Sequence, residues 1–367
     1  MEQISEWIWT DSFWLPQGYT WKDLEPTPGV NKPDFYDLYY VPIFAILILC
    51  IRYVFERFIA TPFCLSLGIA KHIKVVYEEN QICEHVFLAN TKHPNEKQVQ
   101  GLAKQLGWTP HKVNRWFQKR RRSIQVPLLN KASESCWRCV FYFWLFCFGA
   151  YTILPTEWFY DTNKWMEGYI RKQDFNMYLR SYYLMELSFY TSLLFSQFID
   201  AKRKDFYQMF LHHIVTIMLI FSSFAINHHR IGVVIMFLHD ASDFWLEAAK
   251  VFNYAKKQRL CDGLFVMFAI SFFITRWIYY PIWVLHCMIY ISWEIIGPYL
   301  SYYYFTTLLC ILQILHIYWG SLILHMVYKL ATQGKVDRDT RSEDETSDGE
   351  VETVASNNTS ANSKKKK

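Results

Sequence analysis

The stretch IGVVIMFLHDASDFWLEAAKVFN, residues 231–253, decides how this chain is to be interpreted. It is apolar over most of its length, and it is long enough to cross about 30 Å of hydrocarbon as a helix that rises 1.5 Å per residue. Yet it contains His239, Asp240, Asp243, Glu247 and Lys250. Ionisable side chains inside a membrane are costly and are functional candidates by default. The stretch therefore predicts a membrane-spanning helix that contributes to a functional site.

Other apolar runs of similar length occur along the chain. Hydrophobic residues make up 52% of the sequence and aromatic residues 19%, a composition that would leave large apolar patches on a water-soluble surface. We therefore expect an all-α multi-pass membrane protein with about seven transmembrane helices, each near the length that a bilayer requires. The six further predicted spans are roughly 37–58, 138–154, 181–199, 206–226, 261–286 and 303–330.

Basic residues alternate between the connections of these spans. Clusters occur at 115–131, 201–205, 255–259 and from Lys329 onward, whereas the connection 287–302 has no lysine or arginine. Because cytosolic connections carry an excess of basic residues, the alternation predicts a lumenal N-terminus and a cytosolic C-terminus. The predicted organisation is a lumenal segment 1–36, a first span 37–58, a cytosolic region 61–130, a membrane domain 135–330 and a cytosolic tail 333–367.

The tail is polar and without a core pattern, so disorder is expected there. Its acidic stretch SEDETSDGE, 342–350, places Ser342 and Ser347 each three residues before a glutamate, which makes both phosphorylation candidates. The chain ends in four lysines, and Lys364 and Lys365 match a retrieval signal of the endoplasmic reticulum. A solvated basic end is the alternative interpretation. We expect location in the endoplasmic reticulum membrane.

Residues 93–122, HPNEKQVQGLAKQLGWTPHKVNRWFQKRRR, have helix-turn-helix spacing. They resemble the second and third helices of a homeodomain, with Trp116 and Phe117 as core residues. The position that reads adenine in homeodomains is occupied by Lys119, and the first helix has no clear counterpart in the sequence. No specific DNA binding is therefore expected. The basic side chains of Arg120, Arg121 and Arg122 suit anionic lipid headgroups or the phosphates of a soluble cosubstrate.

The strongest chemical signal joins two neighbouring spans. His212 lies roughly 9 Å inside the cytosolic end of its span and Asp243 roughly 15 Å from the same side, so the two groups could meet. His213 and Asp240 adjoin them. A histidine can act as general base or nucleophile while a carboxylate sets its tautomer, an arrangement that suits acyl transfer to an amine or alcohol. The alternative is a buried polar group that only fixes helix packing.

Metal binding is not expected. The histidines do not form the repeated HxxxH or HxxHH clusters of membrane di-iron enzymes, because His228 and His229 fall at the opposite end of the membrane from His212. Cys136 and Cys139 form one CxxC pair, but zinc requires four ligands and the sequence has no second pair nearby.

The stretches FLHHIVTI, 210–217, and LHDASDFWLEAAKVFNY, 238–254, resemble the signature of the ceramide synthases of the Lag1/TLC family. The resemblance covers roughly 135–330 and implies a TLC-type helical bundle around a long acyl cavity. It also explains the homeobox-like insert, which occurs in most animal members. One departure is GYT at 18–20, which lacks the asparagine of the glycosylation sequon that members often have near the N-terminus.

The resemblance implies acyl transfer from a fatty acyl-CoA to the amine of a sphingoid base. His212 or His213 would be the base or the acyl-accepting nucleophile, and Asp240 and Asp243 would orient the imidazole. Acyl-CoA would be a cosubstrate, and no cofactor is expected. Membrane lipids and a homo- or heterodimeric partner are further expected contacts. The candidate contacts to the CoA phosphates are Lys202, Arg203, Lys204, Arg120, Arg121 and Arg122.

The same resemblance links the connection 287–302 to the choice of acyl length, and WEIIGPY resembles the version in members that prefer palmitoyl chains. The alternative is a simple connector with a belt of interfacial aromatic residues. A non-catalytic TLC-type lipid sensor or chaperone is the alternative for the whole protein. The residues expected to influence acyl length are Trp293, Glu294, Gly297, Pro298 and Tyr299.

Overall fold

The computed structural model describes residues 9–70, 76–124, 126–200 and 204–333. These residues are helical with short connections, and among them the only β-type pairing is an isolated bridge between Thr27 and Val30. The chain divides into two compact units: a larger one, Met1–Ile73 with Val126–Arg341, and a smaller one around Lys74–Gln125. The all-α prediction is confirmed. The predicted tail features, including Ser342, Ser347, Lys364 and Lys365, lie outside the described residues.

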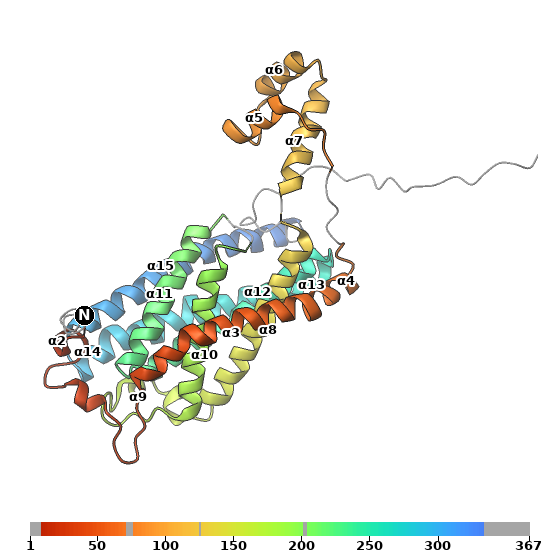
Figure 1. Ribbon diagram of the computed structural model, residues 1–367. Helices are drawn as coiled ribbons and strands as arrows, with labels where there is room; N and C mark the ends of the chain where they lie inside the picture. The colour runs from red at the N-terminus through yellow and green to blue at the C-terminus, as the bar shows by residue number, and fades with distance from the viewer. Residues whose placement is uncertain (1–8, 71–75, 125, 201–203, 334–367) are drawn as a thin grey trace, which may run out of the picture. The chain divides into compact units, whose positions relative to one another are not determined.

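The larger unit is a bundle of long helices with short helical segments at its ends (Figure 1). The long helices are α3 (Tyr40–Phe55), α8 (Leu128–Ile153), α10 (Met177–Ser196), α11 (Phe206–Ala225), α12 (His229–Tyr254), α13 (Gln258–Phe272) and α15 (Leu300–Gln333). The short segments are α2 (Asp11–Trp14), η1 (Trp21–Leu24), η2 (Phe35–Tyr39), η3 (Glu56–Ala60), α4 (Thr61–Ser66), η4 (Glu157–Tyr160), α9 (Thr162–Met166), η6 (Cys287–Ile291) and α14 (Ser292–Ile295). The 13-residue segment η5 (Phe273–Leu285) continues α13 within the bundle.

Helix α12 lies at the centre of this bundle. It packs against α8, α13, η5, α11 and α10, and residues on several of its sides are buried. Val233, Leu238 and Phe244 supply its apolar contacts. Because other helices surround α12 on several sides, its ionisable side chains face protein neighbours instead of lipid.

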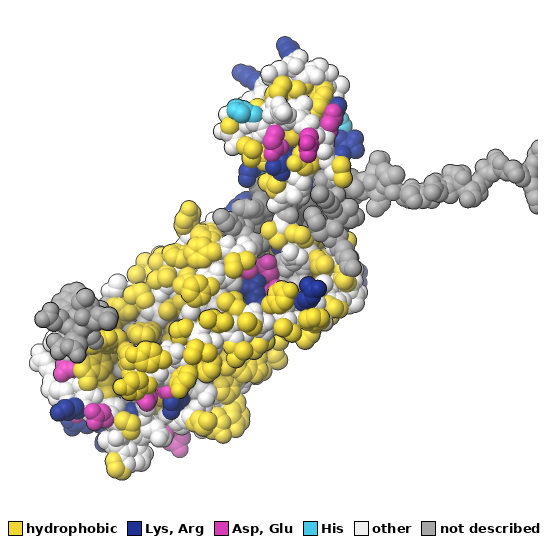
Figure 2. Space-filling view, viewed as in Figure 1, with side chains coloured by type: hydrophobic (Ala, Val, Ile, Leu, Met, Phe, Trp, Pro, Cys, Tyr) yellow, Lys and Arg dark blue, Asp and Glu magenta, His cyan; other side chains and the backbone are white. Residues whose placement is uncertain are grey.

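The outside of the bundle is apolar. On α3, the side chains of Ile43, Ile46 and Ile51 are between 49% and 63% exposed. Large apolar side chains are usually buried in a water-soluble protein, so this arrangement is the reverse. Figure 2 shows hydrophobic side chains covering most of the viewed face of the bundle. Backbone groups inside a bilayer must bond within their own helix, which these long helices achieve. The expectation of a multi-pass membrane protein is confirmed.

Within the part of the chain that the structure describes, five helical stretches are long and apolar enough to cross a membrane, so the predicted count of seven is not confirmed. Helices α10 and α12 correspond to the other two predicted spans, 181–199 and 231–253. They are long enough, but their polar and ionisable side chains keep them below the hydropathy of a simple span. The five are Phe35–Ser66, Pro110–Ile153, Phe206–Ala225, Gln258–Ile295 and Leu300–Thr332.

The expected connection 287–302 is largely helical, which corrects the sequence-based view of it as a loop. The helix that begins with α13 continues through η5, η6 and α14 to Ile295, because almost all of the residues that lead up to Ile295 are apolar or aromatic. It is followed two residues later by Gly297, whose φ of 89° lies in the left-handed region that favours glycine, and then by Pro298. Only Ile296–Tyr299 is left to connect it to α15.

The smaller unit contains three helices, α5 (Gln81–Ala89), α6 (Glu96–Leu106) and α7 (Pro110–Ile124). Phe87, Trp116 and Phe117 are buried in its core. Helix α6 is capped by Asn95, and the turn to α7 uses Gly107 in the left-handed conformation. The expectation that the first homeodomain helix lacks a counterpart is wrong: α5 is that helix, only 9 residues long and therefore weakly marked in the sequence.

Candidate active site

His212 and Asp243 line one cavity of about 90 Å³ inside the bundle. His212 comes from α11 and Asp243 from α12, so the two spans bring together the pair that their depths in the membrane predicted. The same cavity is lined by His239, Arg276 and His316, which arrive from α12, η5 and α15. The side of the bundle where these four elements meet is therefore the candidate active site.

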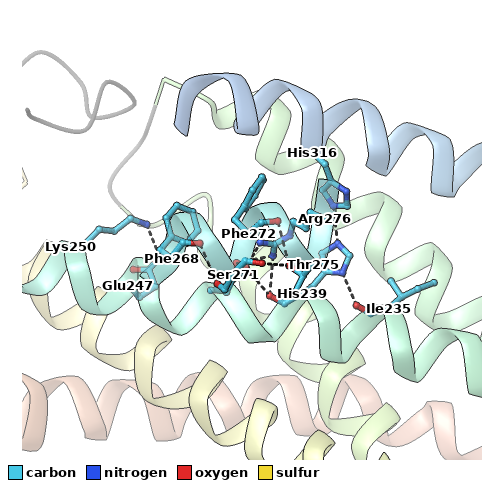
Figure 3. A network of polar contacts seen from close by, with 12 residues as sticks. Ile235, His239, Glu247, Lys250, Phe268, Ser271, Phe272, Thr275, Arg276 and His316 are labelled. Carbon is cyan, nitrogen blue, oxygen red and sulfur yellow. Dashed lines mark hydrogen bonds and ion pairs between the residues drawn. The ribbon is translucent and has the colours of Figure 1, made fainter. Parts of the chain in front are cut away.

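Arg276 connects three groups on α12 (Figure 3). Its Nη2 donates to Asp243 Oδ1 at 2.8 Å and to the carbonyl oxygen of His239 at 3.0 Å, and its Nη1 donates to Ser242 Oγ. Ser242 in turn donates to Asp243 Oδ1 at 3.1 Å. A planar guanidinium that holds several acceptors at once fixes their geometry more rigidly than an ammonium could. Arg276 therefore fixes the position of Asp243 relative to the backbone at His239.

His239 and His316 form a pair whose tautomers follow from their contacts. His239 Nδ1 lies 2.6 Å from the carbonyl oxygen of Ile235, so this nitrogen carries the proton and donates it. His239 Nε2 is then an acceptor, and His316 Nε2, at 2.9 Å, donates to it. This chain of contacts, drawn in Figure 3, can form without a positive charge on either imidazole.

His212 is held mainly by ring contacts. Its ring is stacked with that of His239 at 6.5 Å between centroids, and it forms a T-shaped contact with Trp319 at 5.5 Å between centroids. Its Nδ1 has no hydrogen-bond partner within the described part of the chain. A half-buried imidazole that is positioned by packing and keeps a ring nitrogen available has the properties of a general base or nucleophile.

His213 faces a different cavity. Successive residues of a helix point about 100° apart, so adjacent histidines on α11 present their rings to different neighbours. His213 lines a space of about 100 Å³ together with Arg138, Asp200 and Glu247. Its Nδ1, like that of His212, finds no partner among the described residues.

Asp240 lies apart from both cavities and is fully buried. Its Oδ2 accepts a hydrogen bond from Tyr182 on α10 at 3.2 Å. Glu186, also on α10 and fully buried, is its electrostatic neighbour, and neither carboxyl oxygen of Glu186 has a donor in the described ranges. The expectation that the two aspartates orient the imidazoles stays a prediction; Asp240 accepts a hydrogen bond from Tyr182, and Asp243 accepts hydrogen bonds from Arg276 and Ser242.

A cluster of ion pairs borders the cavity of His213. Arg138 on α8 lies 3.1 Å from Asp200 and 3.5 Å from Glu247, and Asp200 also pairs with Arg52 of α3 at 2.7 Å. Glu247 is 2.6 Å from Lys250. Because buried charges are stable only when paired, these contacts hold α3, α8 and α12 in register beside the site.

The basic residues expected to bind phosphates have different surroundings. Arg120 makes a bidentate ion pair with Glu84 on α5, with its Nη2 2.7 Å from Oε1. This hydrogen bond lowers the pKa of the Glu84 carboxyl and raises that of Arg120. Arg120 is therefore part of the fold of the smaller unit, which weakens its expected phosphate role. Arg121 donates to the carbonyl oxygen of Lys92 at 3.0 Å. Arg122 is half-buried and Lys204 is exposed, whereas Lys202 and Arg203 lie outside the described residues.

The residues expected to influence acyl length differ in how far their side chains are exposed. Trp293 is 44% exposed and packs on Tyr302, with Glu294 exposed beside it on α14. Pro298 is exposed, whereas Tyr299 is 6% exposed and hydrogen-bonded to His228 at 2.8 Å. Tyr299 is thus the member of this set that reaches into the bundle.

Sequence reasoning missed Arg276, His316 and Glu186. All three are ionisable residues inside predicted spans, 261–286, 303–330 and 181–199. The sequence-based argument used the cost of burying ionisable groups in a membrane only for the spans 206–226 and 231–253. Applied to every span, the same argument finds these three as well.

Comparison with known families defines the class of this protein. Residues 131–325 match the family TRAM_LAG1_CLN8, described as the TLC domain, and residues 74–124 match the homeodomain family. The chain is therefore a TLC-domain membrane protein with a homeodomain-like unit.

Individual relatives narrow the class further. The chain is 46% identical to human ceramide synthase 5 over 94% of its own length and 88% of the relative's. It is 40% identical to mouse ceramide synthase 4 over 94% of the chain and 88% of the relative. Identity to human ceramide synthase 3 is 38% over 93% of the chain and 88% of the relative. The chain belongs to the ceramide synthase family, a class of sphingosine N-acyltransferases.

Proposed function

We propose that this protein transfers a fatty acyl group from acyl-CoA to the amine of a sphingoid base at the cavity that contains His212. The observation that carries the assignment is the position of His212, whose half-buried imidazole lines a cavity with Asp243 and has a ring nitrogen without a partner in the described residues. Sphinganine and sphingosine are both suitable acceptors, and the products are dihydroceramide and ceramide.

The chemistry needs a proton acceptor more than a strong acid. A sphingoid amine is protonated in water and must lose a proton to attack the thioester carbon. The carbon–nitrogen bond then forms as the carbon–sulfur bond breaks, and a thiol with a pKa near about 8.5 leaves without strong acid help. His212 serves either as the base that takes the amine proton or as a nucleophile that first accepts the acyl group. Both routes use the same imidazole.

The surrounding pairs support either route electrostatically. A positive charge on His212 is compensated by the Asp243 carboxylate, which Arg276 holds in the same cavity. The neutral His239 ring, stacked on His212, adds no competing charge. Preorganised groups of this kind stabilise charge as it develops, without reorganising during the reaction.

An apolar cavity beside the site suits a chain of about palmitoyl length. His239 lines both this cavity and the one with His212, and the apolar cavity extends along α12 to His228. At 1.5 Å per residue, α12 rises about 16 Å between these two histidines. At about 1.25 Å per methylene, this length matches about 13 methylenes, and since the free volume of the cavity is about 40 Å³, the side chains that line it must move apart to admit the chain. The remaining carbons, at the thioester end, would lie beside His212.

The remaining features are proposed to serve the same reaction. Two separate basic stretches are each suited to CoA phosphates on the cytosolic side of the endoplasmic reticulum membrane, with the N-terminus in the lumen. They are Lys202, Arg203 and Lys204 in the larger unit, and Arg121 and Arg122 in the smaller one. The reaction needs no metal or cofactor beyond the acyl-CoA cosubstrate.

The homeodomain-like unit is proposed to bind no specific DNA sequence, because Lys119 replaces the adenine-reading asparagine. Ser342 and Ser347 remain proposed phosphorylation sites.

The test compares His212→Ala with a matched histidine variant. The purified protein in lipid nanodiscs is assayed with palmitoyl-CoA and sphinganine. His212→Ala should lower amide formation by about 10²–10⁴-fold. His325→Ala removes an exposed imidazole from α15 that lines neither cavity, and it should retain the wild-type rate. Wild-type protein that binds both substrates but forms no amide would instead favour a lipid sensor or chaperone.

A further inference from the structure

The cavity of His213 contains two polar atoms that the reaction described above does not use. His213 is 5% exposed and lines the cavity, and its Nδ1 has no hydrogen-bond partner in the described ranges. Gln197, directly after α10, also lines the cavity. Its Nε2 donates to the carbonyl oxygen of Phe206 at 2.8 Å, whereas its Oε1 is buried without a partner among the same residues. Buried polar atoms are normally hydrogen-bonded, so two unsatisfied atoms at one cavity indicate a polar ligand.

The charged side chains that line this cavity suit a cation. Asp200 and Glu247 both line it, and Arg138 lies 3.1 Å from the first and 3.5 Å from the second. Arg52 and Lys250 pair with these carboxylates, but neither lines the cavity. The described wall thus has two carboxylates and one guanidinium, a balance that favours a positively charged group in the space between them.

The cavity of His213 adjoins the cavity of His212. Tyr142, Met209 and Glu247 line both of them. The two imidazole rings are 5.6 Å apart between centroids. A nitrogen that is hydrogen-bonded to His213 therefore lies close to an acyl group held beside His212. Such proximity of two reactants is what a bond-forming step requires.

Apolar side chains lead from this cavity to the surface of the bundle. Phe206 lines the cavity, and Phe198, which is 58% exposed, packs on it with 5.9 Å between ring centroids. Phe210, which is 36% exposed, lies at 5.9 Å from Phe198. An amphipathic ligand can therefore place its polar end in the cavity and its hydrocarbon along these rings toward the bilayer.

We propose that the cavity of His213 binds the polar head of the sphingoid base, which is an ammonium with neighbouring hydroxyl groups. His213 Nδ1 accepts a hydrogen bond from the ammonium, and Gln197 Oε1 accepts one from a hydroxyl. The carboxylates of Asp200 and Glu247 favour the positive charge. The inference rests on the proposed acyl-CoA-dependent activity and gives its amine substrate a place. It also separates the adjacent histidines by role, since His212 acts on the acyl group while His213 holds the amine.

Two variants distinguish the hydroxyl contact from the ammonium contact. Octadecylamine has the chain and the amine of sphinganine but no hydroxyl, so wild-type protein should prefer sphinganine. Gln197→Met keeps the side-chain length but removes the acceptor. It should lower kcat/KM for sphinganine by about three- to tenfold and leave the value for octadecylamine unchanged. His213→Phe keeps a ring but removes its nitrogens, and it should lower kcat/KM for both amines by about 10–100-fold, because hydrogen bonds to charged groups are stronger.

The experiment uses the purified full chain in lipid nanodiscs, with N-acyl products quantified by mass spectrometry. Each amine is varied at saturating palmitoyl-CoA, and palmitoyl-CoA is varied at saturating sphinganine. In both variants kcat/KM for palmitoyl-CoA should stay within about twofold of the wild-type value. The matched control is Gln313→Met on α15. Gln313 is half-buried and its Oε1 also lacks a partner in the described residues, but it lines neither histidine cavity nor the apolar cavity, so the variant should keep all wild-type values.

The outcomes separate this inference from the proposed activity. Wild-type protein that makes no amide from either amine refutes the activity itself. Wild-type protein that uses octadecylamine as efficiently as sphinganine overturns the head-group site and leaves the activity standing. The site is also overturned if Gln197→Met keeps the wild-type preference between the two amines, or if Gln313→Met changes that preference equally.

The His213 variant has its own contrary result. If His213→Phe lowers kcat/KM for palmitoyl-CoA as much as for the amines, or leaves the amines unaffected, the ring does not hold the amine and the inference fails. If this variant forms no amide or is not monodisperse, the preference measured in Gln197→Met decides. If Gln197→Met is not monodisperse, the values for His213→Phe decide.

Discussion

Replacing Arg276 by methionine should damage both the stability and the activity of the protein. The variant keeps an apolar stem of similar length but loses the guanidinium that contacts Asp243, Ser242 and the carbonyl oxygen of His239. Asp243 is then left in the bundle without its charged partner, and the backbone at His239 loses a donor. Arg276→Lys restores the charge but not the planar fork, so it should recover only part of each loss.

The magnitude follows from burial. The Arg276 side chain is 6% exposed and that of Asp243 is 23% exposed, so the pair is largely but not completely removed from solvent. Removing one partner of a fully buried pair costs about 3–5 kcal/mol, and the partial exposure of Asp243 lowers the expectation to about 2–3 kcal/mol. For a domain of this size, that corresponds to a fall of about 4–12 °C in Tm.

The assay is a double-mutant cycle. Arg276→Met, Asp243→Asn and the double variant are purified in the same detergent, and Tm and the N-acylation rate are measured for each. Because the Asp243→Asn substitution removes the negative charge, the double variant should be less destabilised than the sum of the single variants, by about 1–3 kcal/mol. Additive losses, or an Arg276→Met protein with wild-type Tm and rate, would refute the view that this pair holds the site together.

Three further predictions concern other parts of the chain. Changing Arg121 and Arg122 to glutamine should raise KM for acyl-CoA with little change in kcat, and an unchanged KM counts against their phosphate role. The pair of Glu84 and Arg120 lowers the pKa of Glu84 below its unfolded value, so its stabilisation is complete above about pH 4.5 and is lost as pH falls through the lowered pKa. Hydrogen-exchange protection of α5–α7 in the full chain, corrected for intrinsic rates, should therefore fall in acid, and Glu84→Gln should abolish this dependence. Glu186→Gln should retain more activity than Glu186→Leu because an amide can donate a hydrogen bond to the neighbouring Asp240 carboxyl whereas leucine cannot, and equal rates would argue against a polar role for Glu186.

Much of the bundle was predictable from apolar length alone. The predicted span 206–226 is α11 to within a residue, since its boundaries are set by charged residues at one end and by a polar turn at the other. The meeting of His212 and Asp243 also followed from depth, because helical rise is constant across a bilayer. Both predictions use distance along the membrane normal, which the sequence specifies directly.

Rotation about each helix axis was not predictable. Helix α11 is apolar on most sides, so nothing in its pattern tells which of His212 and His213 faces Asp243. The π-helical turns of η5 change the residue spacing around Arg276, so a 3.6-residue period misplaces its face. Similarly, Tyr182 is a partner of Asp240 from a separate helix, and only the packed bundle brings them together.

The most direct test of the central claim is to quantify CoA thiol and N-acyl product in parallel during turnover. The purified full chain is supplied with palmitoyl-CoA and sphinganine, and both products are followed over time. Acyl transfer from the thioester to the amine predicts equal amounts of free thiol and dihydroceramide at every time point after the first turnover. Thiol release without amide would identify a thioesterase, and the absence of both products would contradict the proposed transferase.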